Sequence, residues 1–140
     1  MKNLFLSTIV LVLALSIFSA EAQNTMHHEK NNYVVLTKKI PQLQPIILTA
    51  EALAEEDGEK FGDFQVIICG KTVTDLTDKE MMQKFIDKAE KANVKIVICG
   101  LSMKKFEVDQ KDISQELEVV GNGILHNFQL QKKGYLSVEL

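Results

Sequence analysis

Several sequence patterns that mark common enzyme classes are absent from this chain of 140 residues. No glycine-rich phosphate loop follows an apolar β-type segment, and no H-E-x-x-H occurs. The only two cysteines, Cys69 and Cys99, lie 30 positions apart and form no C-x-x-C pair. These absences argue against a nucleotide-binding enzyme, a zinc protease and a thioredoxin-type dithiol. We therefore expect neither a metal nor an organic cofactor.

A strong charge of one sign is also missing. The sequence has 16 lysines and arginines against 19 acidic residues, for a formal net charge of −3, and the two signs are mixed along the chain. Such a composition offers no basic surface for nucleic acid or for an acidic membrane. We therefore expect no nucleic-acid partner.

Long apolar runs are scarce, and the one that occurs lies at the amino terminus. Lys2 precedes an apolar stretch over residues 4–18, and the sequence A-E-A at 20–22 is typical of a signal-peptidase site. The stretch is shorter than the roughly 20 residues that a membrane-spanning helix needs. The sequence predicts a cleaved signal peptide over residues 1–22 and a periplasmic or secreted protein that has no membrane contact after cleavage.

The segment that follows the predicted signal peptide has no hydrophobic periodicity. Residues 23–32 therefore predict a flexible leader. The leader contains the adjacent His27 and His28. We expect these histidines to have no role, and transient metal binding is the minor alternative. The remaining residues, 33–140, suit a single domain with one core.

Short β-type runs alternate with segments of helical spacing through the rest of the chain. Strands are expected over residues 33–37, 64–69, 94–99, 117–120 and 135–140. The second and third of these runs are almost continuously apolar, which is typical of strands buried on both faces of a parallel sheet. The pattern predicts a three-layer α/β/α sandwich around a mostly parallel, five-stranded sheet.

Two of the predicted helices carry clear end signals. Between the second and third strands, Thr77 and Glu80 have capping-box spacing, and Asn93 suits the left-handed position after the last turn. The apolar face expected of that helix consists of Met81, Phe85, Ala89 and Ala92. An earlier helix is expected to begin between Pro41 and Pro45 and to end at Gly58.

The last predicted helix has apolar residues on more than one side. Asn122 is expected to cap it, and the stripe expected to face the core is Ile124, Leu125 and Phe128. His126 and Leu130 lie on the opposite side of the helical wheel. We therefore expect His126 to be a surface or subunit-contact residue and not a catalytic base, and Leu130 to be buried between subunits.

Both cysteines follow an apolar strand and precede a glycine, Gly70 in one case and Gly100 in the other. Ligand sites of open α/β folds lie beyond the carboxyl ends of the strands, so both thiols are in a chemically useful place. Two alternatives remain open from the residues alone. A buried cysteine can serve as a small hydrophobic residue, and the two cysteines can form a disulfide if their Cα atoms approach within about 7 Å.

The residues that follow Cys99 favour a reactive thiol. Ser102 is expected to cap a short helix that contains Met103, and Lys104 and Lys105 lie close by. The positive end of a helix and neighbouring lysines both favour thiolate over thiol.

The carboxyl-terminal half of the chain resembles a known family. The pieces C-G-L-S-M-K at 99–104, D-Q-K-D-I at 109–113, E-V-V at 118–120, G-I at 123–124 and L-Q-K-K-G-Y at 130–135 follow one another as in DsrE/DsrF-like proteins. These are small α/β proteins that are associated with sulfur relay and intracellular sulfur oxidation. The resemblance extends over about residues 33–140 and is firmest from residue 94 onward.

The resemblance implies a function for the strand-end thiol. Cys99 matches the cysteine that accepts sulfur as a persulfide in sulfur-carrying members, and the resemblance implies a homo-oligomer, a trimer or hexamer. The residues expected to support the site are Gly100, Ser102, Met103, Lys104, Cys69 and Gly70. The chain departs from the family pattern at Leu101, where asparagine is common, and at Cys69, where histidine is common.

Three hypotheses follow from these observations. The first is an exported DsrE-like carrier, similar to a sulfurtransferase, that binds or transfers sulfane sulfur through Cys99 and exchanges it with donor or acceptor proteins. The second is a non-catalytic oligomeric module of the same fold that binds a small ligand or a protein. The third is a redox protein in which Cys69 and Cys99 form a reversible disulfide.

Overall fold

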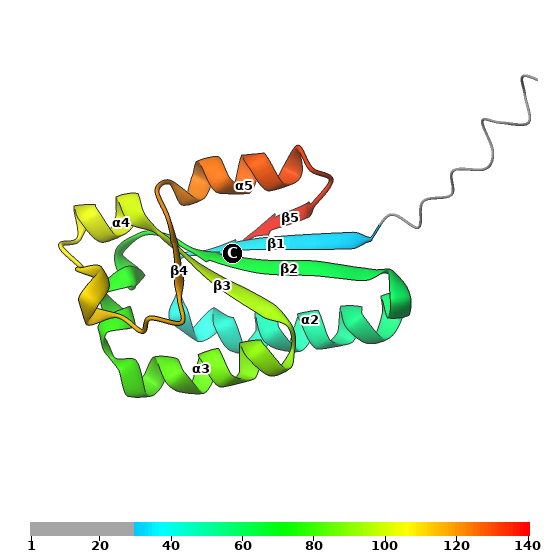
Figure 1. The fold of residues 1–140 in the computed structure, drawn as a ribbon, viewed down its shortest axis with the longest axis horizontal. Coiled ribbons are helices and arrows are strands. Elements are labelled where there is room, and N and C mark those ends of the chain that lie inside the picture. Colours follow the sequence, from blue (N-terminus) through cyan, green and yellow to red (C-terminus); the bar gives the residue numbers. More distant parts are fainter. Residues whose placement is uncertain (1–29) are drawn as a thin grey trace, which may run out of the picture.

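A computed structural model describes residues 30–140 as an α/β sandwich (Figure 1). The predicted signal peptide, most of the predicted leader and the His27–His28 pair lie outside the described residues. The strands are β1 (Asn31–Thr37), β2 (Phe61–Ile68), β3 (Val94–Cys99), β4 (Glu118–Val120) and β5 (Leu136–Glu139). The helices are α2 (Leu43–Asp57), α3 (Lys79–Lys91), α4 (Gly100–Lys105) and α5 (Gly123–Gln131).

The five strands form one sheet in the order β4-β3-β2-β1-β5, and every neighbouring pair is parallel. Helices α2 and α3 lie on one side of the sheet and α5 lies on the other (Figure 1). The predicted three-layer α/β/α sandwich is thus confirmed, with a sheet that is parallel throughout. Strand β1 begins at Asn31, so the last two residues of the predicted leader belong to the sheet.

The sheet separates two cores of unequal size. The larger core lies under α2 and α3, and the smaller one lies on the α5 side of the sheet. The smaller core consists of Val34, Leu36, Ile67, Cys69, Val97, Cys99 and Leu130. Both cysteines therefore belong to the core on which α5 packs.

The predicted ends of the first two helices are largely confirmed. Gly58 follows α2 with a φ of 55°, and Asn93 follows α3 with a φ of 54°. The amino-terminal cap of α3 differs from the prediction, because the side chain of Asp78, and not that of Thr77, accepts the backbone N–H of Met81.

The buried face of α3 is also displaced from the predicted one. Met82 and Ile86 are buried with Ala89, while Met81 and Phe85 are only partly buried. Because apolar side chains occupy both neighbouring rows of this helix, the docking against α2 and β3 decides which row faces the core.

Helix α5 has the opposite orientation to the one predicted. Leu130 is only 4% exposed and belongs to the smaller core, whereas Phe128 is 58% exposed. Ile124 and Leu125, the other members of the predicted core stripe, are also more than half exposed. The helix instead rests on the sheet through Gly123, His126 and Leu130, which recur at helical spacing. The prediction that Leu130 lies on an outer, subunit-facing surface was therefore wrong.

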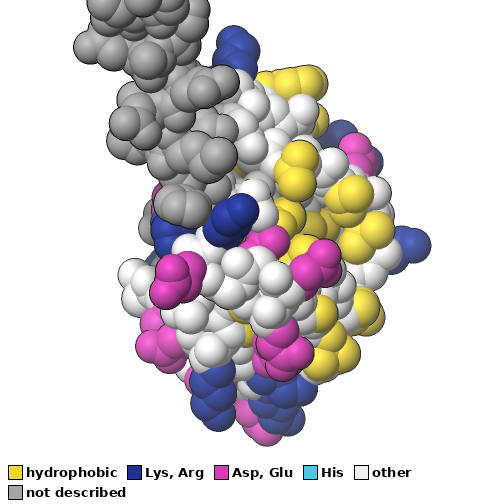
Figure 2. All heavy atoms as spheres, turned by 90° about the vertical axis from the view of Figure 1, so that its right-hand side faces the viewer, with side chains coloured by type: hydrophobic (Ala, Val, Ile, Leu, Met, Phe, Trp, Pro, Cys, Tyr) yellow, Lys and Arg dark blue, Asp and Glu magenta, His cyan; other side chains and the backbone are white. Residues whose placement is uncertain are grey.

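Several large apolar side chains are exposed on the described part of the chain. Figure 2 shows hydrophobic side chains gathered along one side of the face that it displays, beside lysines and acidic residues. The exposed large apolar residues are Leu48, Leu101, Ile124, Leu125, Phe128, Leu136, Val138 and Leu140. Three of them share α5, and three lie on or directly after the edge strand β5. Among residues 30–140, no helix is both long and apolar enough to cross a membrane.

Candidate functional site

The two cysteines lie side by side at the carboxyl ends of β2 and β3. Ile68 and Ile98 are register partners in this parallel pair, so Cys69 and Cys99 are the next residues along the two strands. Neighbouring strands lie about 4.8 Å apart, and residues in register point to the same face of a parallel sheet. Both side chains accordingly belong to the smaller core under α5.

Gly123, the first residue of α5, lies directly over the two thiols. A Cβ atom at this position would lie 2.7 Å from Cys69 Sγ, 2.9 Å from Ile67 Cγ2 and 3.0 Å from Cys99 Cβ. Only glycine permits so close an approach of the backbone. The approach brings the Gly123 N–H to 3.3 Å from Cys99 Sγ, to which it donates a hydrogen bond.

Ser102 contributes to the site in a way that differs from the prediction. Helix α4 begins at Gly100, so Cys99 is the residue at its amino-terminal boundary, and Ser102 lies inside the helix. The Ser102 Oγ accepts the backbone N–H of Gly70 over 2.8 Å. Ser102 also lowers the pKa of the Cys99 thiol, through its side chain and its backbone. Ser102 thus links the residue after Cys69 to the Cys99 thiol.

The two thiols differ in acidity. Burial raises the pKa of Cys99, but hydrogen bonds from Ser102, Gly123 and Cys69 more than offset it, so this pKa lies below its ordinary value. Burial, the charge of Cys99 and the hydrogen bond to Cys99 raise the pKa of Cys69 to about 12. Cys99 is therefore the more acidic thiol of the pair.

The other residues expected to support the site do not contact the thiols in the expected way. Met103 is buried in the larger core, on the other side of the sheet. Lys104 and Lys105 are exposed in the last turn of α4, away from the end that Cys99 borders. The hydrogen bonds to the Cys99 sulfur, and not the lysines, accordingly account for the lowered pKa of this thiol.

His126 is held in a polar network at a distance from the cysteines. Its Nε2 lies 2.9 Å from the side-chain oxygen of Gln65, whose amide donates to Asp63, and Tyr135 also donates to Asp63. Gln65 precedes Cys69 by four residues on an extended segment, which corresponds to about 13 Å. His126 therefore faces the sheet at a distance from both thiols, and the prediction that it points away from the core was wrong.

A pocket of about 410 Å³ opens beside Cys69. Its lining residues are Leu36, Lys38, Cys69, Ile124, Asn127, Phe128, Gln131, Ser137 and Glu139. Lys38 and Glu139 form an ion pair at this pocket. Both thiols are almost fully buried, Cys69 at 5% and Cys99 at 4% exposure, and of the two only Cys69 lines this pocket.

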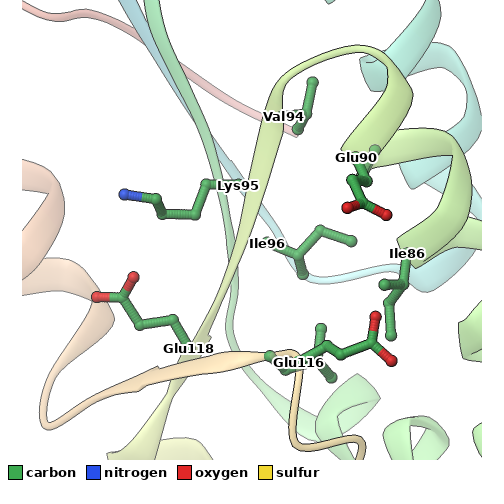
Figure 3. A pocket seen from close by; sticks show the side chains of 9 residues that line it. Ile86, Glu90, Val94, Lys95, Ile96, Glu116 and Glu118 are labelled. Carbon is green, nitrogen blue, oxygen red and sulfur yellow. The ribbon is translucent and has the colours of Figure 1, made fainter.

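A second hollow of about 450 Å³ lies away from the thiols, between α3, β3 and the segment that leads into β4 (Figure 3). Figure 3 shows Glu90 and Glu116 on the same side as Ile96, while Lys95 and Glu118 extend to the other side of β3. No group of three or more histidine, cysteine or acidic side chains within residues 30–140 is arranged to hold a metal ion.

We expect Ser102→Ala to slow the alkylation of Cys99. The change removes a hydrogen bond to the thiolate, so the pKa of Cys99 rises and the thiolate fraction at neutral pH falls, by roughly tenfold. The measurement is the rate of iodoacetamide labelling between pH 6 and pH 10, located by peptide mass. In the unmodified protein Cys99 should react faster than Cys69.

The matched control for this change is Ser114→Ala, because Ser114 is half-buried and its hydroxyl accepts the Glu116 N–H in a separate loop. An unchanged pH profile of Cys99 in Ser102→Ala would contradict the role given to the hydroxyl.

The sequence comparison agrees with this architecture over most of the chain. The sequence model of the DsrE/DsrF-like family matches residues 33–138. The chain belongs to the DsrE/DsrF-like family. The predicted family resemblance is thus confirmed, and with it a fold of the sulfur-relay type. No match is found among curated proteins.

Two solved structures share the fold of this DsrE/DsrF-like protein. The protein of unknown function MTH1491 from Methanobacterium thermoautotrophicum has a TM-score of 0.67 at 16% identity and covers 79% of this chain and 100% of its own. The conserved protein of unknown function BT1422 from Bacteroides thetaiotaomicron has a TM-score of 0.59 at 17% identity and covers 79% of this chain and 95% of its own. At these identities the likeness shows the fold alone.

Sequence reasoning missed two features of the DsrE-like thiol site. It assigned no role to Gly123, although a glycine between a capping asparagine and an apolar helix suggests a close backbone approach. It also missed the pocket beside Cys69, because the residues that line it come from β1, α5 and β5 and from the ends of two strands.

Proposed function

We propose that this protein carries sulfane sulfur as a persulfide on Cys99. The observation that carries the proposal is the hydrogen bond that the Gly123 N–H donates to Cys99 Sγ, and it agrees with the lowered pKa of this thiol. This bond stabilises negative charge on a sulfur that is otherwise shielded from water. Family membership supports the proposal, because it provides a fold of the sulfur-relay type.

The proposed reaction is a sulfur transfer between thiolates. The Cys99 thiolate attacks the outer sulfur of a persulfide or polysulfide donor, and the sulfur–sulfur bond of the donor breaks. The electron pair of that bond leaves with the donor as a thiolate or a shorter polysulfide. Cys99 then carries the sulfane sulfur as a persulfide anion, which the same hydrogen bond can stabilise.

We also propose that the protein acts outside the cytoplasm and as a homo-oligomer. Export is supported by the signal-peptide pattern over residues 1–22. Assembly is supported by the exposed apolar face of α5, formed by Ile124, Leu125 and Phe128. Covering these three half-exposed side chains with a second copy of the chain would contribute roughly 2–4 kcal/mol per subunit.

The test of the carrier function is the mass of the mature protein after treatment with inorganic polysulfide. We expect an adduct of about 32 Da that a reductant removes, since persulfides exchange with thiols. Cys99→Ser should abolish the adduct and keep the fold, because the substitution is small and lies at the end of a strand. An adduct that persists in Cys99→Ser, or one that forms only on Cys69, would show that Cys99 is not the carrier.

A further inference from the structure

We infer that Cys69 is the resolving thiol of this site, which attacks the Cys99 persulfide, closes a Cys69–Cys99 disulfide and releases the sulfane sulfur as hydrosulfide. This inference rests on the proposed persulfide at Cys99. It adds a second reaction, through which the protein reduces the sulfur that it carries.

The positions of the two cysteines provide the geometry that this reaction needs. Cys69 and Cys99 follow the register pair Ile68 and Ile98 on neighbouring parallel strands, and their side chains lie in the same small core. The spacing of neighbouring strands, about 4.8 Å, falls within the Cα separations that disulfides span. Each thiol also shifts the pKa of the other, in agreement with this proximity.

The backbone of α5 approaches both thiols at Gly123, which places no side chain of its own against them. Gly123 has no Cβ, and a Cβ there would meet Cys69 Sγ at 2.7 Å and Cys99 Cβ at 3.0 Å. The Gly123 N–H donates a hydrogen bond to Cys99 Sγ. This arrangement distinguishes the two cysteines, since the hydrogen bond from Gly123 stabilises negative charge on Cys99 and not on Cys69.

The pocket beside Cys69 provides the route by which a small anion can leave. Cys69 is one of its lining residues, while Cys99 is not. Lys38 and Glu139 line this pocket from the side of the sheet, and their ion pair is exposed to solvent. A hydrosulfide ion released between the thiols can depart through this opening, and a small thiol reductant can enter by it.

The atoms and electrons of the step balance within the site. The Cys69 sulfur attacks Cys99 Sγ, and the bond between Cys99 Sγ and the outer sulfur breaks. The electron pair of that bond leaves with the outer sulfur, which takes the Cys69 proton and departs as hydrosulfide. The sulfane sulfur is reduced to sulfide, and the two cysteine sulfurs are oxidised to a disulfide. The persulfide is itself the oxidant, so the step needs no other.

The experiment follows the loaded protein over time. Mature protein is treated briefly with inorganic polysulfide, freed of excess donor by rapid desalting, and then sampled for its mass and for free sulfide. In the unmodified protein we expect the adduct of about 32 Da to decay into a species about 2 Da lighter than the dithiol, with one hydrosulfide released per disulfide. In Cys69→Ser the adduct should persist and no sulfide should appear.

The variants separate this inference from the proposed function. If the adduct lasts as long in the unmodified protein as in Cys69→Ser, and the unmodified protein forms no disulfide, the resolving role is overturned. The carrier function would then remain intact. Transfer of the adduct to Cys69 would also overturn it, because Cys69 would then accept sulfur instead of displacing it. The absence of an adduct from both Cys69→Ser and Cys69→Ala, with folding verified by circular dichroism, would overturn the carrier function and this inference together.

Discussion

Leu130→Asp is expected to unfold the domain, although Leu130 belongs to a helix whose other large apolar side chains are exposed. Leu130 is 4% exposed and packs in the smaller core with Val34, Leu36 and Val97. The change removes a buried leucine and places a carboxylate among apolar side chains, at a cost of at least about 4 kcal/mol in the free energy of unfolding. Such a loss is a large fraction of the total free energy of unfolding of a domain of this size. Urea unfolding followed by circular dichroism measures the loss.

Phe128→Asp is the matched control on the same helix, two positions away. Because Phe128 is 58% exposed, its replacement should change the stability of a subunit by less than about 1 kcal/mol. If the apolar face of α5 lies between subunits, the same variant should lower the mass measured by light scattering. If Leu130→Asp is folded and Phe128→Asp is unfolded, α5 packs on the sheet through Ile124, Leu125 and Phe128, as the sequence alone predicts.

Gly123→Ala is expected to damage both the fold and the thiol chemistry. The added Cβ would lie within 3.0 Å of Cys69 Sγ, Ile67 Cγ2 and Cys99 Cβ, so the start of α5 must move away from the sheet. Overpacking of this kind costs roughly 1–3 kcal/mol. The movement also lengthens the hydrogen bond from the Gly123 N–H to Cys99 Sγ, so the pKa of Cys99 should rise and its alkylation at neutral pH should slow.

Gly121→Ala is the control for this substitution, because a Cβ at Gly121 has no atom within 4 Å and lies in the same loop. Its effect on stability should stay within about 0.5 kcal/mol. Thermal unfolding and the pH profile of alkylation, measured on both variants, separate the two positions. If Gly121→Ala and Gly123→Ala lose equal stability, the loop tolerates no side chain at either position. The close approach of Gly123 to the thiols would then not be the cause of the loss.

The sequence by itself determined the features of this protein that depend on near neighbours in the chain. The alternation of apolar runs with helical spacing was sufficient to predict a three-layer sandwich, because parallel strands need crossover helices. Asn122 and Asn93 were assigned correctly, since Asn122 accepts the N–H groups of Ile124 and Leu125, and Asn93 has a positive φ. Each of these assignments concerns a hydrogen bond or a backbone angle within a few residues.

Only the tertiary structure decided how α5 lies and what surrounds the thiols. Helix α5 carries apolar side chains on two sides, so the sequence favours the larger stripe, but the approach of Gly123 to the cysteines turns Leu130 inward. The position of Cys69 beside Cys99 depends on β2 and β3 being neighbours in register, and the bond from the Gly70 N–H to Ser102 depends on two loops meeting beyond those strands. These contacts join residues 24 to 32 positions apart. The packing of elements on one another determines such contacts, and no local pattern specifies them.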